Sequence, residues 1–129
     1  MVVTFASPVT VTSASVTSGT GSVSGFTITG SQVTVNLASV TTAQRMSVTL
    51  SGVSDATTTN DVVIPMAILI GDVTGEGVVD ISDLTQARSA IGQPVTIVNF
   101  RDDVSPDGQL NKKDSNSIRA NLGLQLPPL

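Results

Sequence analysis

Two short segments of the chain repeat one pattern of oxygen-bearing side chains and glycine, 31 residues apart. The first runs from 72 to 83 and the second from 103 to 114. Each is twelve residues long, places oxygen side chains at positions 1, 3, 5, 9 and 12, and has glycine at position 6. Such oxygens are the ligands of a hard metal cation, and the glycine allows the sharp turn that the loop needs.

This spacing predicts two bound calcium ions. Calcium takes six to eight oxygen ligands, and a twelve-residue EF-hand loop supplies them from these positions, including the backbone carbonyl of position 7. The expected ligands of the first loop are Asp72, Thr74, Glu76, the Val78 carbonyl, Asp80 and Asp83. Those of the second are Asp103, Ser105, Asp107, the Gln109 carbonyl, Asn111 and Asp114. Seven of the ten carboxylates of the chain occupy these positions, where they would repel one another without a cation.

The alternative interpretation is a pair of acidic turns that cap helices, since Asp and Gly are common turn residues. Helix-like segments follow both loops, at 81–91 and 112–122, and each stops before a glycine. Two loops in register, each leading into such a helix, favour calcium over simple caps. The apolar residues expected to face inward are Ile81, Leu84 and Ile91 in the first helix and Ile118 and Leu122 in the second.

The first 60 residues have a different composition. They contain 25 Ser or Thr residues and two charged residues, whereas residues 71–129 hold eight of the ten acidic and five of the six basic residues. Alternation of apolar and polar residues in Val33–Leu37 and Met46–Leu50 predicts half-buried strands, separated by turn-forming clusters. We therefore expect a small antiparallel β-sandwich of six or seven strands over 1–70 and a calcium-binding module over 71–129. The apolar run 62–70 is expected to form a central strand.

Composition also disfavours several classes of function. The absence of Cys and His removes thiol catalysis, Cys/His zinc sites and any imidazole base. A net charge of −4 and 2% aromatic residues disfavour nucleic acid binding, and no apolar run approaches the roughly 18 residues of a membrane span. We expect no enzymatic activity, because nearly all carboxylates that could act in glycoside hydrolysis are at calcium positions. An internal isopeptide bond would have to use Lys112 or Lys113.

The first repeat matches a known family. The segment 71–84, with sequence GDVTGEGVVDISDL, resembles the first duplicated segment of a type I dockerin, and the resemblance extends over roughly 70–127. Dockerins have two calcium loops, each followed by a helix. The region before it resembles the immunoglobulin-like modules that precede dockerins in multidomain bacterial proteins. The resemblance implies a secreted or cell-surface bacterial setting, cellulosome-like assembly and a cohesin partner that docks on the helices.

The recognition positions of this chain depart from the family. Dockerins usually carry Ser or Thr at loop positions 10 and 11, where this chain has Ile81-Ser82 and Lys112-Lys113, although Arg88 and Arg119 recur at matching positions. The expected function is a non-catalytic assembly or attachment module. Its calcium-folded helices would contact a cohesin-like protein or the adjacent β domain of the same monomeric chain. The alternative is a purely structural, calcium-stabilised cap or spacer of a larger secreted protein, with no dedicated partner.

Overall fold

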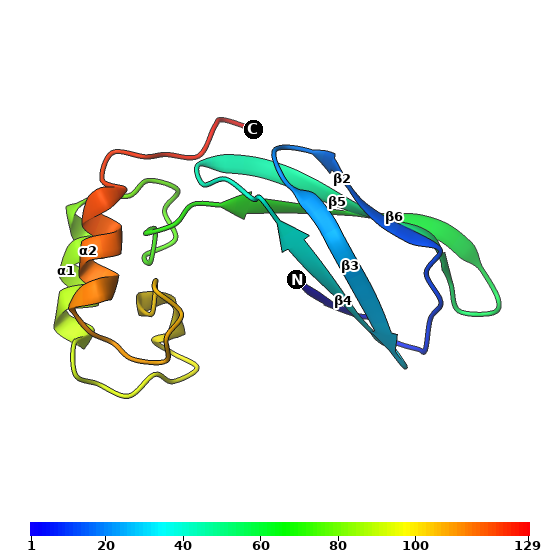
Figure 1. Ribbon diagram of the computed structural model, residues 1–129, viewed down its shortest axis with the longest axis horizontal. Coiled ribbons are helices and arrows are strands. Elements are labelled where there is room, and N and C mark those ends of the chain that lie inside the picture. The colour runs from blue at the N-terminus through cyan, green and yellow to red at the C-terminus, as the bar shows by residue number, and fades with distance from the viewer. The chain divides into compact units, whose positions relative to one another are not determined.

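The computed structural model describes residues 1–129, which form two compact units, Met1–Ala67 and Ile68–Leu129 (Figure 1). The chain is mainly β, with six strands in two three-stranded sheets and two short α-helices. This content is consistent with the expected β-sandwich followed by a small helical module. The division between the units lies slightly before the expected one at residue 70.

The first unit contains the two sheets. The strands are β1 (Val2–Thr4), β2 (Ser13–Ser18), β3 (Ser22–Thr29), β4 (Gln32–Ala38), β5 (Gln44–Ser54) and β6 (Thr59–Ile68). One sheet has the order β1-β4-β3 and the other has the order β2-β5-β6. In both, the central strand, β4 or β5, is the one in which alternation of apolar and polar residues is clearest. Pairing of β4 with β1 and β3, and of β5 with β2, is antiparallel.

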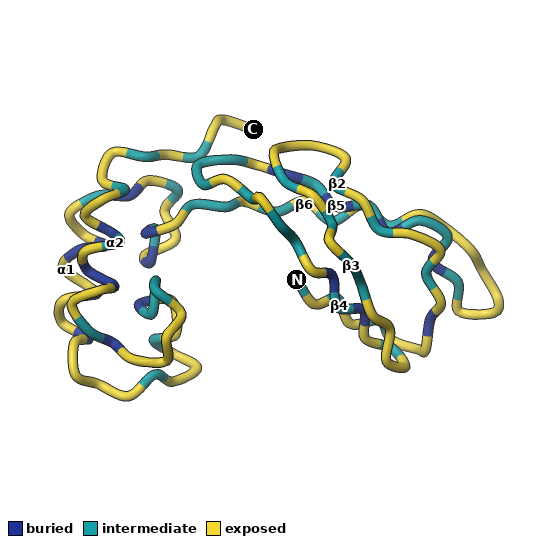
Figure 2. The backbone as a smooth tube through the Cα atoms, in the orientation of Figure 1, coloured by how far each residue is buried: buried dark blue, intermediate teal, exposed yellow.

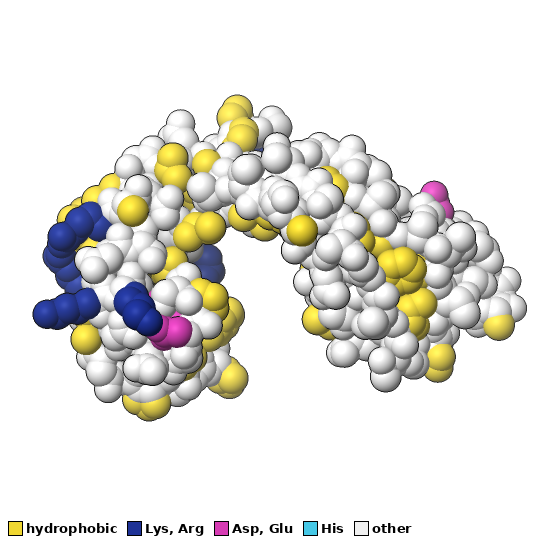
Figure 3. Space-filling model, viewed as in Figure 1, with side chains coloured by type: hydrophobic (Ala, Val, Ile, Leu, Met, Phe, Trp, Pro, Cys, Tyr) yellow, Lys and Arg dark blue, Asp and Glu magenta, His cyan; other side chains and the backbone are white.

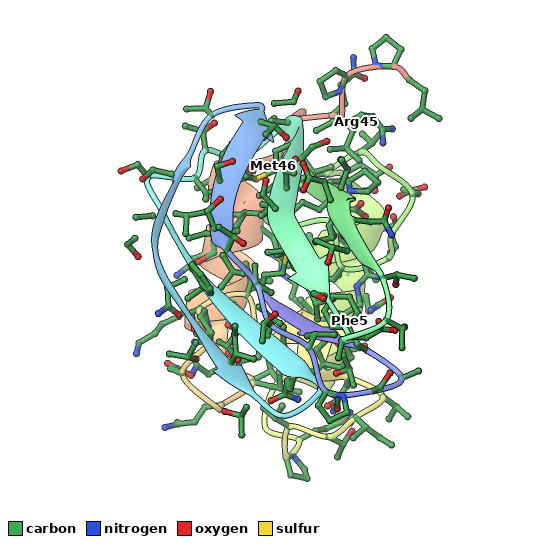
Figure 4. The ribbon with its side chains drawn as sticks, turned by 90° about the vertical axis from the view of Figure 1, so that its right-hand side faces the viewer. Phe5, Arg45 and Met46 are labelled. Atoms are coloured by element: carbon green, nitrogen blue, oxygen red, sulfur yellow. The ribbon has the colours of Figure 1, made fainter.

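The core of the first unit comes from the two central strands. Val33 and Val35 of β4 and Val48 and Leu50 of β5 have no exposed surface, and Met46 of β5 is 2% exposed. Figure 2 shows the buried positions alternating along these strands, as expected for a sheet with one face packed inward. Met46 is labelled in Figure 4 beside its exposed neighbour Arg45.

The last strand, β6, differs from its prediction. The strand order places it at the edge of its sheet, so the prediction of a central strand for 62–70 is wrong. Pro65 has no N–H to donate, and proline in sheets is confined to edges, ends and bulges. Val63 is 59% exposed, which shows that one of the two apolar faces of this strand is solvated.

The second unit contains two helices and a short 3-10 turn. Helix α1 spans Ile81–Ala90, the turn η1 spans Phe100–Asp102, and α2 spans Lys112–Ala120. Both α-helices begin with a reciprocal capping box, in which the side chains of the N-cap and the N3 residue each accept a backbone N–H of the other. The helices end one and two residues before the predicted ends.

The inner faces of the helices are partly those predicted. The core cluster of this unit consists of Val73, Val79, Leu84, Ala87 and Ile118. Ile81, however, is 66% exposed, because it lies two residues, or about 200° around the helix, from the buried Asp83. Ile91 and Leu122 are 39% and 42% exposed, since both lie beyond the helical residues. The prediction that Ile81, Ile91 and Leu122 face inward is therefore wrong.

The two loop–helix segments are cross-connected through their ends. The N–H of Gly92, after α1, donates to the carbonyl of Leu110 in the second loop at 2.9 Å. The N–H of Gly123, after α2, donates to the carbonyl of Val79 in the first loop, also at 2.9 Å. Because Val79 and Leu110 are equivalent positions of the repeat, each loop is held by the segment that follows the other helix.

Candidate metal centre

The first loop is organised around the carboxylate of Asp72, at position 1. One of its oxygens, Oδ1, accepts the N–H groups of Gly75 at 2.7 Å and Glu76 at 3.1 Å, and Oδ2 accepts that of Gly77 at 2.9 Å. Gly77 has a φ of +87°, a left-handed conformation that glycine adopts without strain. The glycine at position 6 thus makes the turn that was expected of it.

The last residue of the loop, Asp83, has no exposed surface. Its Oδ1 accepts the N–H of Thr74 at 3.0 Å and the hydroxyl of Thr74 at 2.9 Å, while Oδ2 accepts the N–H of Asp80 at 2.8 Å. A buried carboxylate is costly unless its charge is compensated. Here dipolar donors of the loop itself provide part of that compensation.

Three carboxylates of the first loop form a cluster able to hold a metal ion. Glu76, Asp80 and Asp83 each offer an oxygen within 4.8 Å of the others. The hydroxyl of Ser82 donates at 2.6 Å to Asp80 Oδ1 and lies 2.9 Å from Glu76 Oε1. The Ser82 hydroxyl and N–H lower the pKa of Asp80, so this group stays ionised.

The second loop repeats the framework of the first. Asp103 accepts the N–H of Asp107 through Oδ1 at 3.1 Å and that of Gly108 through Oδ2 at 2.9 Å. Asp114, 1% exposed, accepts the N–H groups of Ser105 and Asn111 at 2.9 Å each. The carboxylates at positions 1 and 12 therefore accept the same backbone N–H groups in the two loops, with one exception. Position 4 is Pro106 in the second loop and has no N–H for the contact that Gly75 makes.

The two predicted carbonyl ligands lie at backbone bridges. Val78 forms an isolated antiparallel bridge with Gln125, and Gln109 forms the equivalent bridge with Pro94. The Gln109 carbonyl also accepts the side-chain amide of Asn111 at 3.4 Å. Position 7 is thus held in the same way in both loops.

One hydroxyl of the second loop is left without a partner. Ser105 Oγ, at position 3, is buried and makes no hydrogen bond, whereas the equivalent Thr74 hydroxyl donates to Asp83. Leaving a buried polar atom unsatisfied typically costs about 1–3 kcal/mol. A cation held by this loop would give Ser105 Oγ a partner. The predicted ligand atoms of the loop are all oxygens, so the residues present fit a hard cation.

A lysine distinguishes the second loop from the first. Lys113 Nζ lies 2.9 Å from Asp107 Oδ2 and forms an ion pair with it. The hydrogen bond from Lys113 lowers the pKa of Asp107, and the same bond raises the pKa of Lys113. The predicted ligand Asp107 is therefore already paired with a cation of the chain.

Arg101 is a residue of the site that sequence reasoning missed. From η1 it donates through Nη2 to the backbone carbonyl of Asp72 at 3.1 Å. Gly75 itself has a φ of +85°, a left-handed conformation that favours glycine, and a Cβ at this position would lie 2.9 Å from Arg101 Nη1. No spacing rule relates Arg101 to a loop 29 residues away, so only the folded chain could reveal this contact.

Neither helix has the length and apolar character that crossing a membrane would require. Comparison of the chain with protein-family models, with curated proteins and with solved structures gave no match.

Proposed function

We propose that the second unit is a dockerin-like module that binds two calcium ions and serves non-catalytic assembly or attachment outside the cell. The first unit would be an immunoglobulin-like sandwich that carries it. The observation that carries the proposal is the recurrence of one hydrogen-bond framework in two twelve-residue loops, with oxygen donors at the calcium positions of both. A helix cap needs only the residues at positions 9 and 12, so it does not account for the matching contacts of the position-1 carboxylates in the two loops.

Calcium is favoured over other cations by the donor set. All side-chain donors are oxygens, which disfavours the soft and borderline metals that prefer sulfur or imidazole. The loops supply enough oxygens for the six to eight ligands of calcium, while magnesium prefers to keep several waters. Asp rather than Glu at position 12, and hydroxyls at position 3, favour the weaker affinities that suit extracellular calcium.

The same carboxylates link calcium to the helices. Asp83 and Asp114 are both the last residues of the loops and the N3 residues of the capping boxes of α1 and α2. A cation bound in each loop would therefore hold the first turn of the helix that follows that loop in place. Calcium binding and folding of the second unit are coupled in this proposal.

The surface of the second unit suits a protein partner with acidic groups. Arg88 and Arg119 lie in the last turns of α1 and α2, at equivalent positions, and both are exposed. Figure 3 shows cationic side chains gathered over this unit. A cohesin-like protein is the proposed partner. The unlike pairs Ile81-Ser82 and Lys112-Lys113 favour binding through one helix in preference to the other.

A structural role without a dedicated partner is the second candidate. It is supported by the C-terminal segment, which is tied to the first loop by the bonds Val79 N–H to Leu124 O at 2.8 Å and Leu126 N–H to Gly77 O at 2.9 Å. Leu124 also packs against the helical core. A segment used in this way stabilises the unit whether or not a partner binds.

Calcium titration with partner capture separates these candidates. In chelator-stripped protein, added calcium is expected to raise the helical signal in circular dichroism, and no change would refute the calcium proposal. Immobilised protein is then offered purified cohesins with and without chelator. Calcium-dependent binding supports assembly, while helix gain without binding supports the structural role.

A further inference from the structure

The two loops share a framework but differ at position 11, which is Ser82 in the first and Lys113 in the second. This position lies directly beside the ligand at position 5 in both loops. Ser82 Oγ is 2.9 Å from Glu76 Oε1, and Lys113 Nζ is 2.9 Å from Asp107 Oδ2. A neutral hydroxyl therefore faces one ligand, and the positively charged ammonium of an exposed lysine faces the other.

The ion pair leaves Asp107 with both oxygens engaged. Oδ2 accepts from the Lys113 ammonium, and Oδ1 accepts the N–H of Gln109 at 3.1 Å. The Ser82 hydroxyl can rotate away from Glu76 without moving a charge. For the Asp107 carboxylate to serve as a ligand, the Lys113 ammonium must either leave it or stay close to the divalent ion.

We infer that Lys113 is an internal competitor for the second calcium, so that the two loops fill in order, the first loop before the second. The inference rests on the proposed calcium function and adds a control of site occupancy to it. Two effects act in the same direction. The ammonium occupies a ligand oxygen in the calcium-free loop, and its charge repels the ion in the loaded loop.

The expected size of the effect follows from the charges. A unit positive charge about 6 Å from a divalent ion in water lowers its affinity roughly tenfold. Charges that lie farther away and face solvent are screened by salt and have a smaller effect. Replacing Lys113 by serine should therefore raise the calcium affinity of the second loop roughly tenfold, toward that of the first.

The test is a calcium titration of the full chain followed by NMR, because it resolves the two loops. The amide groups of Gly77 and Gly108 are matched reporters, since each donates at 2.9 Å to the first ligand of its own loop. In the unmodified protein, the Gly77 signal is expected to reach its midpoint at a lower calcium concentration than that of Gly108.

Lys113→Ser and Lys112→Ser form a matched pair of variants. Both remove one positive charge, but Lys112 is an exposed neighbour at position 10, outside the ion pair with Asp107. Lys113→Ser should lower the Gly108 midpoint roughly tenfold, and Lys112→Ser should lower it less than about threefold. Equal shifts in the two variants would overturn the inference, because net charge alone would then account for the effect.

The reciprocal exchange provides a second test that does not depend on the first. Ser82→Lys should raise the calcium midpoint of Gly77, and Ile81→Lys, at the equivalent of position 112, should raise it less. An unchanged Gly77 midpoint in Ser82→Lys would contradict the inference. If neither glycine signal responds to calcium up to about 10 mM, a concentration above the dissociation constants of the weakest such loops, the proposed function itself fails. If both respond at one concentration in every variant, only the role of Lys113 fails.

Discussion

The two units of the chain are stabilised by different means. The buried side chains of the first unit are all apolar and come mostly from β4 and β5. The second has a smaller apolar cluster and buries the carboxylates Asp83, Asp102 and Asp114. Apolar burial stabilises a fold by itself, whereas buried carboxylates require donors or cations. The comparison indicates that dependence on a metal should be confined to the second unit.

Removing calcium should have the largest effect on stability, and it should affect the second unit but not the first. With chelator, the helical signal of the second unit is expected to fall, since structural metals contribute much of the folding free energy of small modules. The core amides of the first unit, such as that of Val48, should keep their hydrogen-exchange protection. Loss of protection at Val48 on chelation would show that the units do not differ in this way.

A cavity in the first unit should affect that unit alone. Leu50→Ala removes a fully buried side chain and is expected to destabilise the first unit by about 2–5 kcal/mol. Urea unfolding followed by NMR signals of each unit measures this. Val63→Ala, at an exposed position of β6, is the control and should change stability little. Altered calcium affinity in Leu50→Ala would contradict the separation of the two units.

Asp114→Asn should act on the second unit only. The side-chain amide places an N–H donor against the N–H of Ser105 or Asn111, and an unsatisfied buried group costs about 1–3 kcal/mol. The second loop should also lose calcium binding, which calorimetry would register as a stoichiometry reduced from two to one. Asn116→Ala, on the exposed side of α2, should leave both quantities unchanged.

The turn between β5 and β6 gives the first unit a modest pH dependence. Asp55 Oδ1 accepts the hydroxyl of Thr57 at 2.6 Å and the N–H of Thr58 at 2.9 Å, and these bonds lower the pKa of Asp55. A lowered pKa in the folded state stabilises the protein above the unfolded value of about 4, and this contribution is lost as the pH falls below it. Asp55→Asn should flatten the urea-unfolding profile of the first unit between pH 5 and about 2. An unchanged profile would show that the turn contributes nothing to this dependence.

Local patterns in the sequence predicted local structure. The position of the glycines predicted the turns at Gly77 and Gly108, and Asp80 and Asn111 begin helices close to the expected residues. These features depend on neighbours within about twelve residues, so a linear pattern contains them. Alternation likewise predicted the half-buried strands around Val33 and Val48.

Contacts between distant segments could not be predicted in this way. The edge position of β6 depends on which strands pair with it, and the contact of Arg101 with Asp72 depends on how η1 folds back to the first loop. The pairing of Lys113 with Asp107 joins residues six apart, yet spacing alone does not indicate whether a lysine faces a ligand or solvent. In each case the three-dimensional arrangement decides, and several arrangements share one sequence pattern.

The most direct test of the central proposal is calorimetric titration of calcium into chelator-stripped protein. The oxygen-lined loops predict two ions bound per chain, with dissociation constants at or below the millimolar range. The first loop is expected to bind calcium more tightly than the second. The variant Asp83→Asn, Asp114→Asn, in which both loops lose their buried ligand, should bind none. Absence of binding by the unmodified chain, with helices already formed, would contradict the proposal and leave the two loops as helix caps.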